Sequence, residues 1–124
     1  MASFFADSYA IIEILKGNEN YREYQSSHLV TTEFNICEVA FAVCRDYPTK
    51  ARRVMTLVRT MVNLEPTIDE DYCYGAGMRK ATSAVGKKLS TIDCVGYSVA
   101  YRLDIPFLTG DREFENIKHV EFVR

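Results

Sequence analysis

The chain has 124 residues, of which 48% are hydrophobic and 26% are charged, a balance typical of one globular domain and not of a disordered or fibrous protein. Fifteen basic residues against 17 acidic ones give a net charge of −2. This charge excludes a protein that holds nucleic acid mainly by bulk positive charge. Contact with phosphate groups through bound metal ions remains compatible with it.

The sequence predicts a cytoplasmic protein with no membrane partner. No uncharged stretch approaches the ~20 apolar residues that a membrane-spanning helix needs. The apolar stretch at 4–15 is interrupted by Asp7 and Glu13 and has no basic flank or cleavage site. The cysteines stand singly in apolar helical surroundings, which predicts reduced core cysteines and neither disulfides nor a zinc site; they are Cys37, Cys44, Cys73 and Cys94.

The first half of the chain alternates short apolar strands with helices. Asp7 and Ser8 form a typical N-cap after the first strand, and Thr32 is a typical N-cap after the second. Gly17 and Asn18 end the first helix, and Pro48 opens the last one. We expect a strand at 3–6, a helix at 9–15, one helical turn at 21–25, a strand at 28–31, and helices at 32–46 and 49–62.

The second half continues the alternation. Thr67 and Glu70 have the spacing of a capping box, which predicts a helix from there to about Lys87, although Gly75 and Gly77 weaken it. The remaining elements are an amphipathic helix at 91–103, a strand at 106–109, a turn at 110–112 and a last strand at 120–123. The whole pattern predicts one domain, residues 1–124, of the α/β class: a small, mostly parallel twisted sheet of four to five short strands with helices on both faces.

Three aspartates follow strands or begin helices. Asp7 and Asp111 each come directly after a strand, and Asp93 lies in the first turn of a helix. Doubly wound sheets bind ligands outside the carboxyl ends of their strands, so these side chains are expected at one edge. Taken singly, Asp7 and Asp93 also suit helix caps, and Asp111 suits an ordinary turn.

A fourth acidic residue, Glu38, lies within the predicted helix at 32–46. Its neighbours on the same helix face are Phe34, Phe41 and Ala42. This apolar face predicts that Glu38 points against the core, where an unpaired carboxylate is strongly unfavourable. Glu38 therefore needs either a buried arginine or a cation beside it.

One pocket that held all four carboxylates would be unstable through like-charge repulsion unless cations filled it. Mg²⁺ or Mn²⁺ fits best, because both prefer oxygen ligands and keep several waters. The absence of nearby histidine and cysteine argues against zinc. His28 and His119 lie away from the acidic motifs, which makes a histidine general base improbable.

Four segments together resemble the motifs of PIN domains, in the right order along nearly the whole chain. They are Phe4-Phe5-Ala6-Asp7-Ser8-Tyr9, Val30-Thr31-Thr32 followed by Glu38, Ser90-Thr91-Ile92-Asp93-Cys94-Val95, and Pro106-Phe107-Leu108-Thr109-Gly110-Asp111-Arg112-Glu113-Phe114. The length is similar to that of the VapC-like toxins of toxin–antitoxin pairs. Two departures are the single Asp of the third motif and Gly110, which replaces a larger residue and predicts a looser turn.

The resemblance implies an Mg²⁺- or Mn²⁺-dependent endoribonuclease. Asp7, Glu38, Asp93 and Asp111 would be the catalytic and metal-binding quartet, and Thr109 would support them through its hydroxyl. The expected partners are an RNA substrate, a second copy of the chain in a homodimer, and a cognate antitoxin that enters the acidic groove, often with an arginine.

Contacts with RNA are expected from local basic residues. The candidates are Arg45, Arg79 and Lys80, for which a solvated helix face is the alternative interpretation. A second function also fits the sequence: a catalytically weak or inactive PIN-like domain that acts as an RNA- or protein-binding module. Metal-dependent cleavage of RNA separates the two functions.

Overall fold

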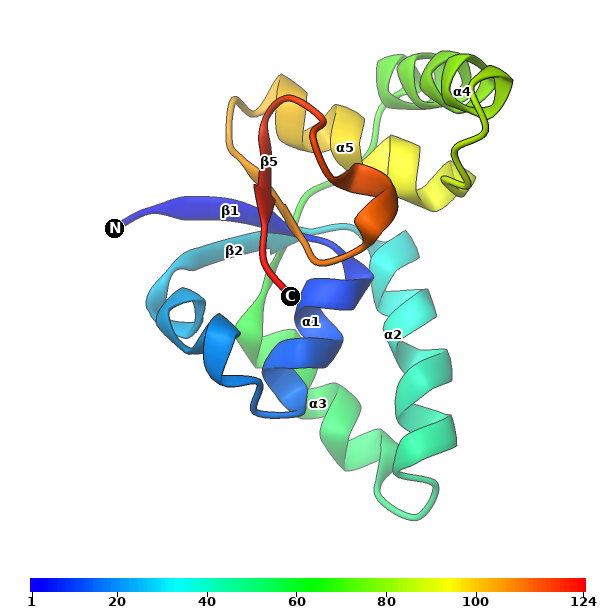
Figure 1. Ribbon diagram of the computed structural model, residues 1–124. Helices are drawn as coiled ribbons and strands as arrows, with labels where there is room; N and C mark the ends of the chain where they lie inside the picture. The colour runs from blue at the N-terminus through cyan, green and yellow to red at the C-terminus, as the bar shows by residue number, and fades with distance from the viewer.

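Figure 1 shows the computed structural model of residues 1–124, in which helices cover both faces of a five-stranded sheet. The elements in chain order are β1 (Ser3–Ala6), α1 (Ser8–Leu15), the 3₁₀ helix η1 (Glu19–Ser26), β2 (His28–Thr31), α2 (Glu33–Asp46), α3 (Ala51–Met61), β3 (Asn63–Leu64), α4 (Asp69–Ala84), α5 (Thr91–Arg102), β4 (Phe107–Thr109), the 3₁₀ helix η2 (Arg112–Phe114) and β5 (Val120–Phe122).

The strand order is β3-β2-β1-β4-β5, and all neighbouring strands are parallel. The chain winds outward from β1 to β3 and then crosses to the other side of β1 to form β4 and β5. The winding therefore changes direction between β1 and β4, the position where doubly wound sheets bind ligands. The predicted α/β fold with a small parallel sheet is confirmed.

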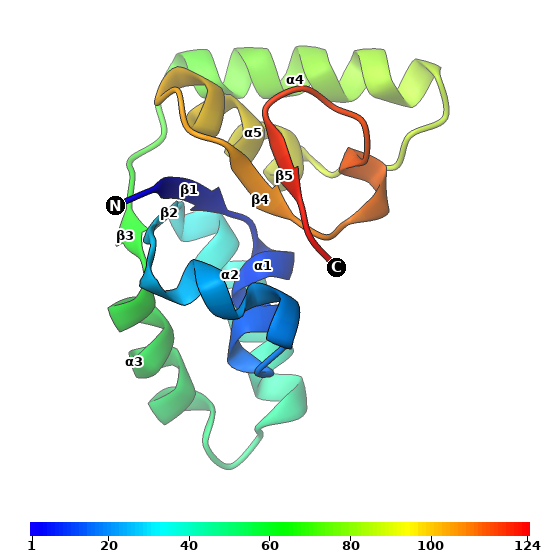
Figure 2. The same cartoon turned by 60° about the vertical axis from the view of Figure 1, so that its left-hand side comes forward.

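Two hydrophobic clusters fill the space on the two faces of the sheet, because successive side chains of a strand point to opposite sides. Ala6 and Leu108 lie in the cluster that contains residues of α1, α2 and α3. Phe5 and Phe107, one position earlier in each strand, lie in the cluster under α5. Figure 2 shows α4 on the outer side of α5, so α4 packs on a helix and not on the sheet.

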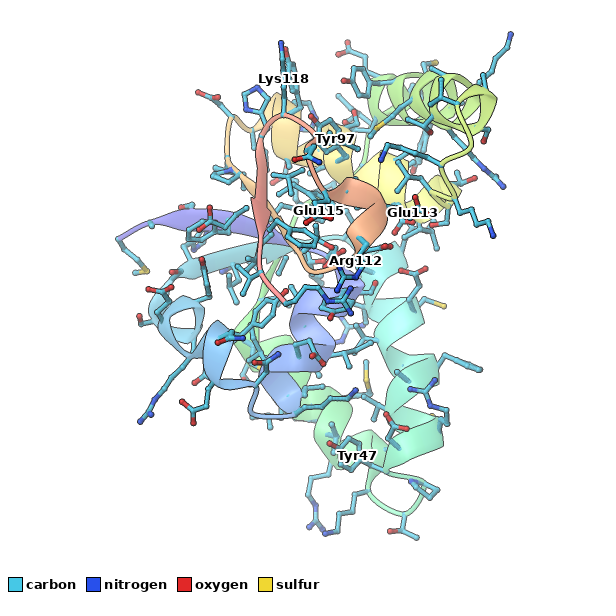
Figure 3. The ribbon with its side chains drawn as sticks, viewed as in Figure 1. Tyr47, Tyr97, Arg112, Glu113, Glu115 and Lys118 are labelled. Carbon is cyan, nitrogen blue, oxygen red and sulfur yellow. The ribbon has the colours of Figure 1, made fainter.

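Tyr97 fastens α5 to the last part of the chain. Its ring packs against Phe107 and Phe114, and its hydroxyl donates a hydrogen bond of 2.5 Å to the carbonyl of Lys118. In Figure 3, Tyr97 lies between Lys118 above it and Glu113 and Glu115 below it, far from Tyr47 at the opposite end of the molecule. This contact holds the loop that follows β4, and with it one side of the carboxyl edge of the sheet.

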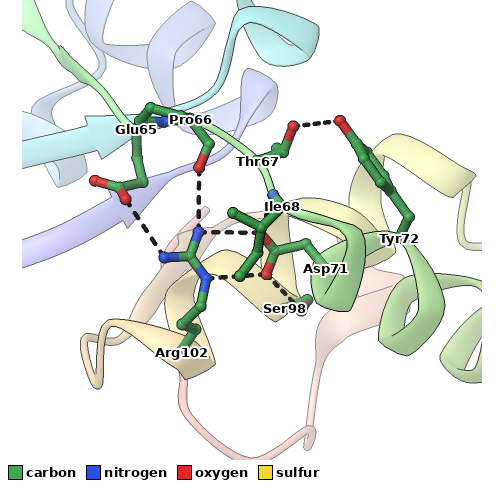
Figure 4. Close-up of polar contacts among 8 residues, drawn as sticks. All are labelled: Glu65, Pro66, Thr67, Ile68, Asp71, Tyr72, Ser98 and Arg102. Carbon is green, nitrogen blue, oxygen red and sulfur yellow. Dashed lines mark hydrogen bonds and ion pairs between the residues drawn. The ribbon is translucent and has the colours of Figure 1, made fainter.

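Arg102 at the end of α5 holds the start of α4 (Figure 4). Its Nη2 and Nε donate to the two carboxylate oxygens of Asp71 at 3.0 and 3.2 Å, and Nη1 lies 3.4 Å from Glu65 Oε2. Ser98 Oγ adds a hydrogen bond of 3.0 Å to Asp71. Burial raises the pKa of Asp71, but the hydrogen bonds from Arg102, Ile68 and Ser98 outweigh burial and keep this pKa below its ordinary value.

Some predicted boundaries were wrong. The predicted capping box of Thr67 and Glu70 does not form: Asp71 instead accepts the N–H of Ile68 at 3.0 Å, and the Thr67 hydroxyl contacts the hydroxyl of Tyr72. Helix α4 ends at Ala84, and α3 begins two residues later than expected. Strand β3 was not predicted, because its two residues are both exposed and carry no alternating pattern.

The expectation of core cysteines holds for one of them. Cys94 is buried, whereas the other three are exposed, and all four are free thiols. Apolar neighbours in the sequence do not reveal which face of a helix a residue occupies, and the exposed cysteines lie on the outer faces of α2 and α4. They are Cys37, Cys44 and Cys73. No helix of the chain combines the length and apolar character needed to cross a bilayer.

Candidate active site

The four acidic residues singled out in the sequence line one cleft of about 520 Å³ at the carboxyl edge of the sheet. Asp7 follows β1, Asp111 follows β4, Asp93 lies in the first turn of α5, and Glu38 lies on α2. The predicted gathering of the four side chains is therefore what the structure shows. Other lining residues that matter below are Ser8, Tyr9, Phe41, Arg45 and Ser90.

Asp7 lies deepest, with 3% of its surface exposed. It is the N-cap of α1: Oδ1 accepts the N–H of Ala10 at 2.8 Å. Its Oδ2 accepts a hydrogen bond of 2.5 Å from Thr109 Oγ1. Burial raises the pKa of Asp7 to about 7, and the charges of Asp93 and Asp111 add to the rise. Asp7 is thus a carboxyl group that changes protonation near neutral pH.

Thr109 connects two of the acidic residues. While its hydroxyl donates to Asp7, Oγ1 accepts the N–H of Asp111 at 3.0 Å. Asp111 in turn is the N-cap of η2, since its Oδ1 accepts the N–H of Glu113 at 3.0 Å. The last residue of β4 therefore fixes the position of one acid and the backbone of another.

Gly110 lies between Thr109 and Asp111 in the short connection from β4 to η2. A Cβ atom here would overlap the ring of Tyr9 and the carbonyl oxygen of Val123. The absence of a side chain at Gly110 therefore lets three segments of the chain approach one another closely.

A directional set of hydrogen bonds holds Glu38. Thr32 Oγ1 donates to Asn35 Oδ1 at 2.7 Å, Asn35 Nδ2 donates to Ser8 Oγ at 3.1 Å, and Ser8 Oγ donates to Glu38 Oε1 at 2.5 Å. Burial raises the pKa of Glu38, the hydrogen bond from Ser8 opposes this, and the charge of Asp93 adds to it. Sequence reasoning missed Asn35, although its place three residues after a cap threonine was a usable signal.

The expectation that Glu38 points into the core was wrong in one respect. Phe34 and Phe41, which share its helix face, are 43% and 69% exposed, so this face of α2 is open to solvent, and Glu38 and Phe41 line the cleft there. Phenylalanine in a sequence is normally a sign of burial, and nothing local distinguishes these two rings from buried ones.

Asp93 and Ser90 form a capping box at the start of α5. Asp93 Oδ2 accepts the N–H of Ser90 at 2.8 Å, and Ser90 Oγ accepts the N–H of Asp93 at 3.0 Å. Burial raises the pKa of Asp93, the bonds from Ser90 lower it, and the charge of Asp111 raises it further. The cap and the cleft therefore use the same carboxylate.

The donor set suits a hard divalent cation. No basic side chain forms an ion pair with any of the four acids. Glu38 Oε2, Asp93 Oδ1 and Asp111 Oδ2 have no hydrogen-bond partner in the protein, and since no buried polar side-chain atom lacks one, these oxygens face solvent. Oxygen donors of this kind are preferred by Mg²⁺ and Mn²⁺. In this arrangement no three of the acids lie close enough together to hold a metal ion between them.

Of the three basic residues proposed to contact RNA, only one lines the cleft. Arg45 lines the cleft, where it is paired with Asp46 at 2.9 Å. Arg79 and Lys80 lie on α4 outside the cleft, and Arg79 Nη1 donates to Thr91 Oγ1 at 2.7 Å. Neither histidine lines the cleft: His28 lies beside Asn63, and His119 packs on Tyr101.

The sequence model of the PIN domain family matches residues 4–120. The chain belongs to the PIN domain family. No curated protein matches this PIN domain at a significant level of sequence similarity.

Several solved structures with the same fold are those of toxins or of toxin–antitoxin complexes. Mycobacterium tuberculosis VapC20, described as a toxin that cleaves the sarcin–ricin loop, has a TM-score of 0.78 at 14% identity, covering 98% of this PIN domain and 99% of that chain. A chain of VapBC2 from Rickettsia felis, solved with a fragment of promoter DNA, has a TM-score of 0.76 at 11% identity, with the same two coverages. A chain of DNA-bound VapBC from Salmonella typhimurium has a TM-score of 0.75 at 17% identity, covering 98% and 97%.

Proposed function

We propose that this PIN domain is a divalent-metal-dependent endoribonuclease and the toxin of a toxin–antitoxin pair. The observation that carries the proposal is the cleft in which four carboxylates gather without a single basic partner. Such an arrangement lowers the stability of the fold through repulsion, so it is explained best by a cation that binds there. The family of the chain and the toxins that share its fold support the same function.

The residues of the cleft have separable roles in this proposal. Asp93 and Asp111 would bind the cation through the oxygens that face solvent, with the carboxylate of Glu38 beside them in the same cleft. Asp7, whose two oxygens already accept hydrogen bonds, would contribute its negative charge from its position deepest in the cleft. When bound, Mg²⁺ or Mn²⁺ supplies Lewis-acid chemistry, because it acidifies water and neutralises charge on a phosphate group. Thr109 would hold Asp7 and Asp111 in position.

Glu38 is the residue placed to handle a proton. Its Oε1 is fixed by Ser8, while Oε2 faces the cleft. Burial and the charge of Asp93 raise its pKa, which makes its carboxylate a better proton acceptor than an exposed glutamate. We propose that Glu38 Oε2 orients the attacking water and takes its proton. No side-chain nucleophile is needed.

The experiment is a cleavage assay on a pool of single-stranded oligoribonucleotides with Mn²⁺ or Mg²⁺. We expect endonucleolytic products that disappear with excess chelator and with Asp7→Asn. Asp104→Asn is the matched control, because Asp104 is exposed and has a φ of +56°, which asparagine tolerates well. Cleavage that persists in chelator would exclude the metal-dependent mechanism.

A non-catalytic binding module is the second candidate function. The observation that favours it is that no three acids of the cleft already form a closed ligand set. An intact, folded protein that binds RNA but cuts none with either metal would support this module and count against the nuclease.

The proposed partners are RNA, a cognate antitoxin and a second copy of the chain. An acidic cleft without a basic side chain bonded to its acids suits an inhibitor that inserts an arginine. We expect the product of a neighbouring small gene to co-purify with this chain and to suppress its cleavage activity. A neighbouring protein that binds but leaves cleavage unchanged would contradict the antitoxin assignment.

A further inference from the structure

Phe41 is the most exposed phenylalanine of the chain, with 69% of its surface in water, and it lines the acidic cleft. Three other phenylalanines, Phe5, Phe107 and Phe114, are fully buried. Phe34 is half exposed but packs edge-on against Tyr72, whereas Phe41 has no aromatic partner. A large, unpartnered ring at the wall of a polar cleft indicates a surface that something apolar covers.

The ring lies between two kinds of charge on one face of α2. Glu38, Phe41 and Arg45 stand at positions i, i+3 and i+7, and all three line the cleft. Arg45 is the one basic residue among the lining side chains. At ~1.5 Å of rise per residue, Glu38 and Arg45 are separated by roughly 10 Å along the helix axis, with the ring between them.

This order of groups matches the chemistry of a single-stranded nucleic acid. Proteins bind such strands by stacking bases on aromatic rings beside cationic groups that contact the phosphates. On α2, the carboxylate proposed to orient the attacking water is followed by an aromatic ring and then by a guanidinium. The phosphate at the cleavage site would lie beside Glu38, the next base would stack on Phe41, and the following phosphate would contact Arg45.

We infer that Phe41 and Arg45 form a stacking subsite for single-stranded RNA, in which Phe41 packs against the nucleobase next to the bond that is cut and Arg45 contacts the adjoining phosphate. This inference rests on the proposed function, because it uses the acidic cleft as the place where the phosphodiester lies. An apolar protein segment is the competing occupant of the ring. It fits less well, because an apolar segment offers no anion to the guanidinium of Arg45, whereas a nucleic acid offers a phosphate beside each base.

The absence of tryptophan from the chain allows a direct test. Phe41→Trp places the only tryptophan of the chain in the subsite, where it can be excited apart from the tyrosines, and stacking of a base on the indole quenches its emission. The titration uses a single-stranded oligoribonucleotide with Mg²⁺ and an Asp7→Asn background, so that the RNA stays whole. Phe34→Trp is the matched control, because Phe34 lies on the same helix but does not line the cleft.

We expect saturable quenching of the tryptophan at 41 and little change at 34. In the same background, Phe41→Ala is expected to weaken RNA binding roughly tenfold, as loss of one stacked base does, and Arg45→Gln to reduce the salt dependence of binding. Equal quenching at both positions, or an unchanged affinity with Phe41→Ala, would overturn the subsite. A tryptophan at 41 that responds to a co-purifying protein and not to RNA would assign the ring to a protein interface and also overturn it.

The test of the stacking subsite and the test of the nuclease can succeed or fail independently. Quenching at 41 without cleavage by the unmodified chain would retain the subsite and reject the nuclease. Cleavage by the unmodified chain together with an unchanged KM for Phe41→Ala would retain the nuclease and reject the subsite.

Discussion

At the scale of single residues, Thr109 has the most informative place in the cleft, because one hydroxyl group serves two acids. It donates to Asp7 Oδ2 and accepts the N–H of Asp111. The hydrogen bond from Thr109 is the largest influence that lowers the pKa of Asp7 against the effect of burial. This makes Thr109 a residue that sets the protonation of the cleft without facing its opening.

Thr109→Val is expected to raise the pKa of Asp7 above about 7. Since less Asp7 is then ionised at neutral pH, RNA cleavage at pH 7 should fall and its rise with pH should move to higher pH. The free energy of unfolding should drop by about 1–2 kcal/mol, as for other buried hydrogen bonds. Thr109→Ser, which keeps the hydroxyl, is the control. An unchanged pH profile with Thr109→Val would contradict this role.

Most of the acidic cleft could be predicted from the sequence, because strand ends and helix starts meet at one edge of a parallel sheet. Asp7 and Asp111 illustrate this rule. The exposure of Phe41 could not be predicted, since it depends on which segment packs beside α2 and not on the residues near it in the sequence. The hydrogen bonds that hold Glu38 likewise join residues from α1 and α2, so no single segment of the sequence reveals them.

At the scale of elements, the contact between α4 and α5 depends on Gly75. A Cβ atom at this position would lie 3.0 Å from the backbone nitrogen of Val95, whereas a Cβ at Gly77 would meet nothing within 4 Å. Gly75 therefore allows the two helices to approach closely, and Gly77 only lowers the helix propensity of α4.

The two glycines give a matched pair of variants. Gly75→Ala should destabilise the protein by about 1–3 kcal/mol, because the backbone of α5 cannot move aside easily. Gly77→Ala should stabilise it by up to about 1 kcal/mol through better helix propensity. Chemical denaturation monitored by circular dichroism measures both. Equal effects of the two substitutions would show that α4 does not pack on α5 as described.

Arg102→Met tests the ion pair that anchors α4. It leaves the carboxylate of Asp71, which is 1% exposed, without its cationic partner. Because Arg102 itself is partly exposed, we expect a loss of about 2–4 kcal/mol at pH 7. The folded-state pKa of Asp71 is lowered, so the stabilisation from the pair is present above the ordinary pKa and is lost as pH falls through the lowered one. The difference between the two proteins should therefore shrink in acid.

A double variant, Arg102→Met with Asp71→Asn, controls for the lost packing of the arginine. It should recover part of the stability, because no buried charge remains. Failure to recover any would assign the loss to packing alone. Sequence reasoning placed this helix but not its anchor, since it assigned the cap to Thr67 and Glu70 and left Asp71 out.

At the scale of the whole molecule, the winding of the sheet explains why the acids meet. The strand order β3-β2-β1-β4-β5 places β1 and β4 side by side, although about 100 residues separate them in the chain. The alternation of strands and helices was sufficient to predict a parallel sheet. It was not sufficient to predict the edge strand β3, whose pairing with β2 depends on backbone groups and not on side-chain pattern.

The acidic cleft should also govern how the stability of the metal-free protein depends on pH. Burial raises the pKa of Asp7 to about 7 from 3.8, and it raises those of Glu38 and Asp93 as well. Between about pH 4 and pH 7 the folded state therefore binds more protons than the unfolded state, and the free energy of unfolding falls as pH rises. Above about pH 7 the cost of the ionised Asp7 is fully present.

Thermal unfolding at pH 5 and pH 8 measures this dependence. We expect a higher Tm at pH 5 in chelator. At pH 8, Asp7→Asn should raise the stability by roughly 1–3 kcal/mol, because it removes the buried charge. Millimolar Mg²⁺ or Mn²⁺ should raise the Tm of the unmodified protein at pH 8 and have less effect at pH 5, where protons compete for the carboxylates. A Tm that responds to neither pH nor metal would mean that the four carboxylates do not interact with one another. It would contradict the proposal that the cleft binds a divalent cation.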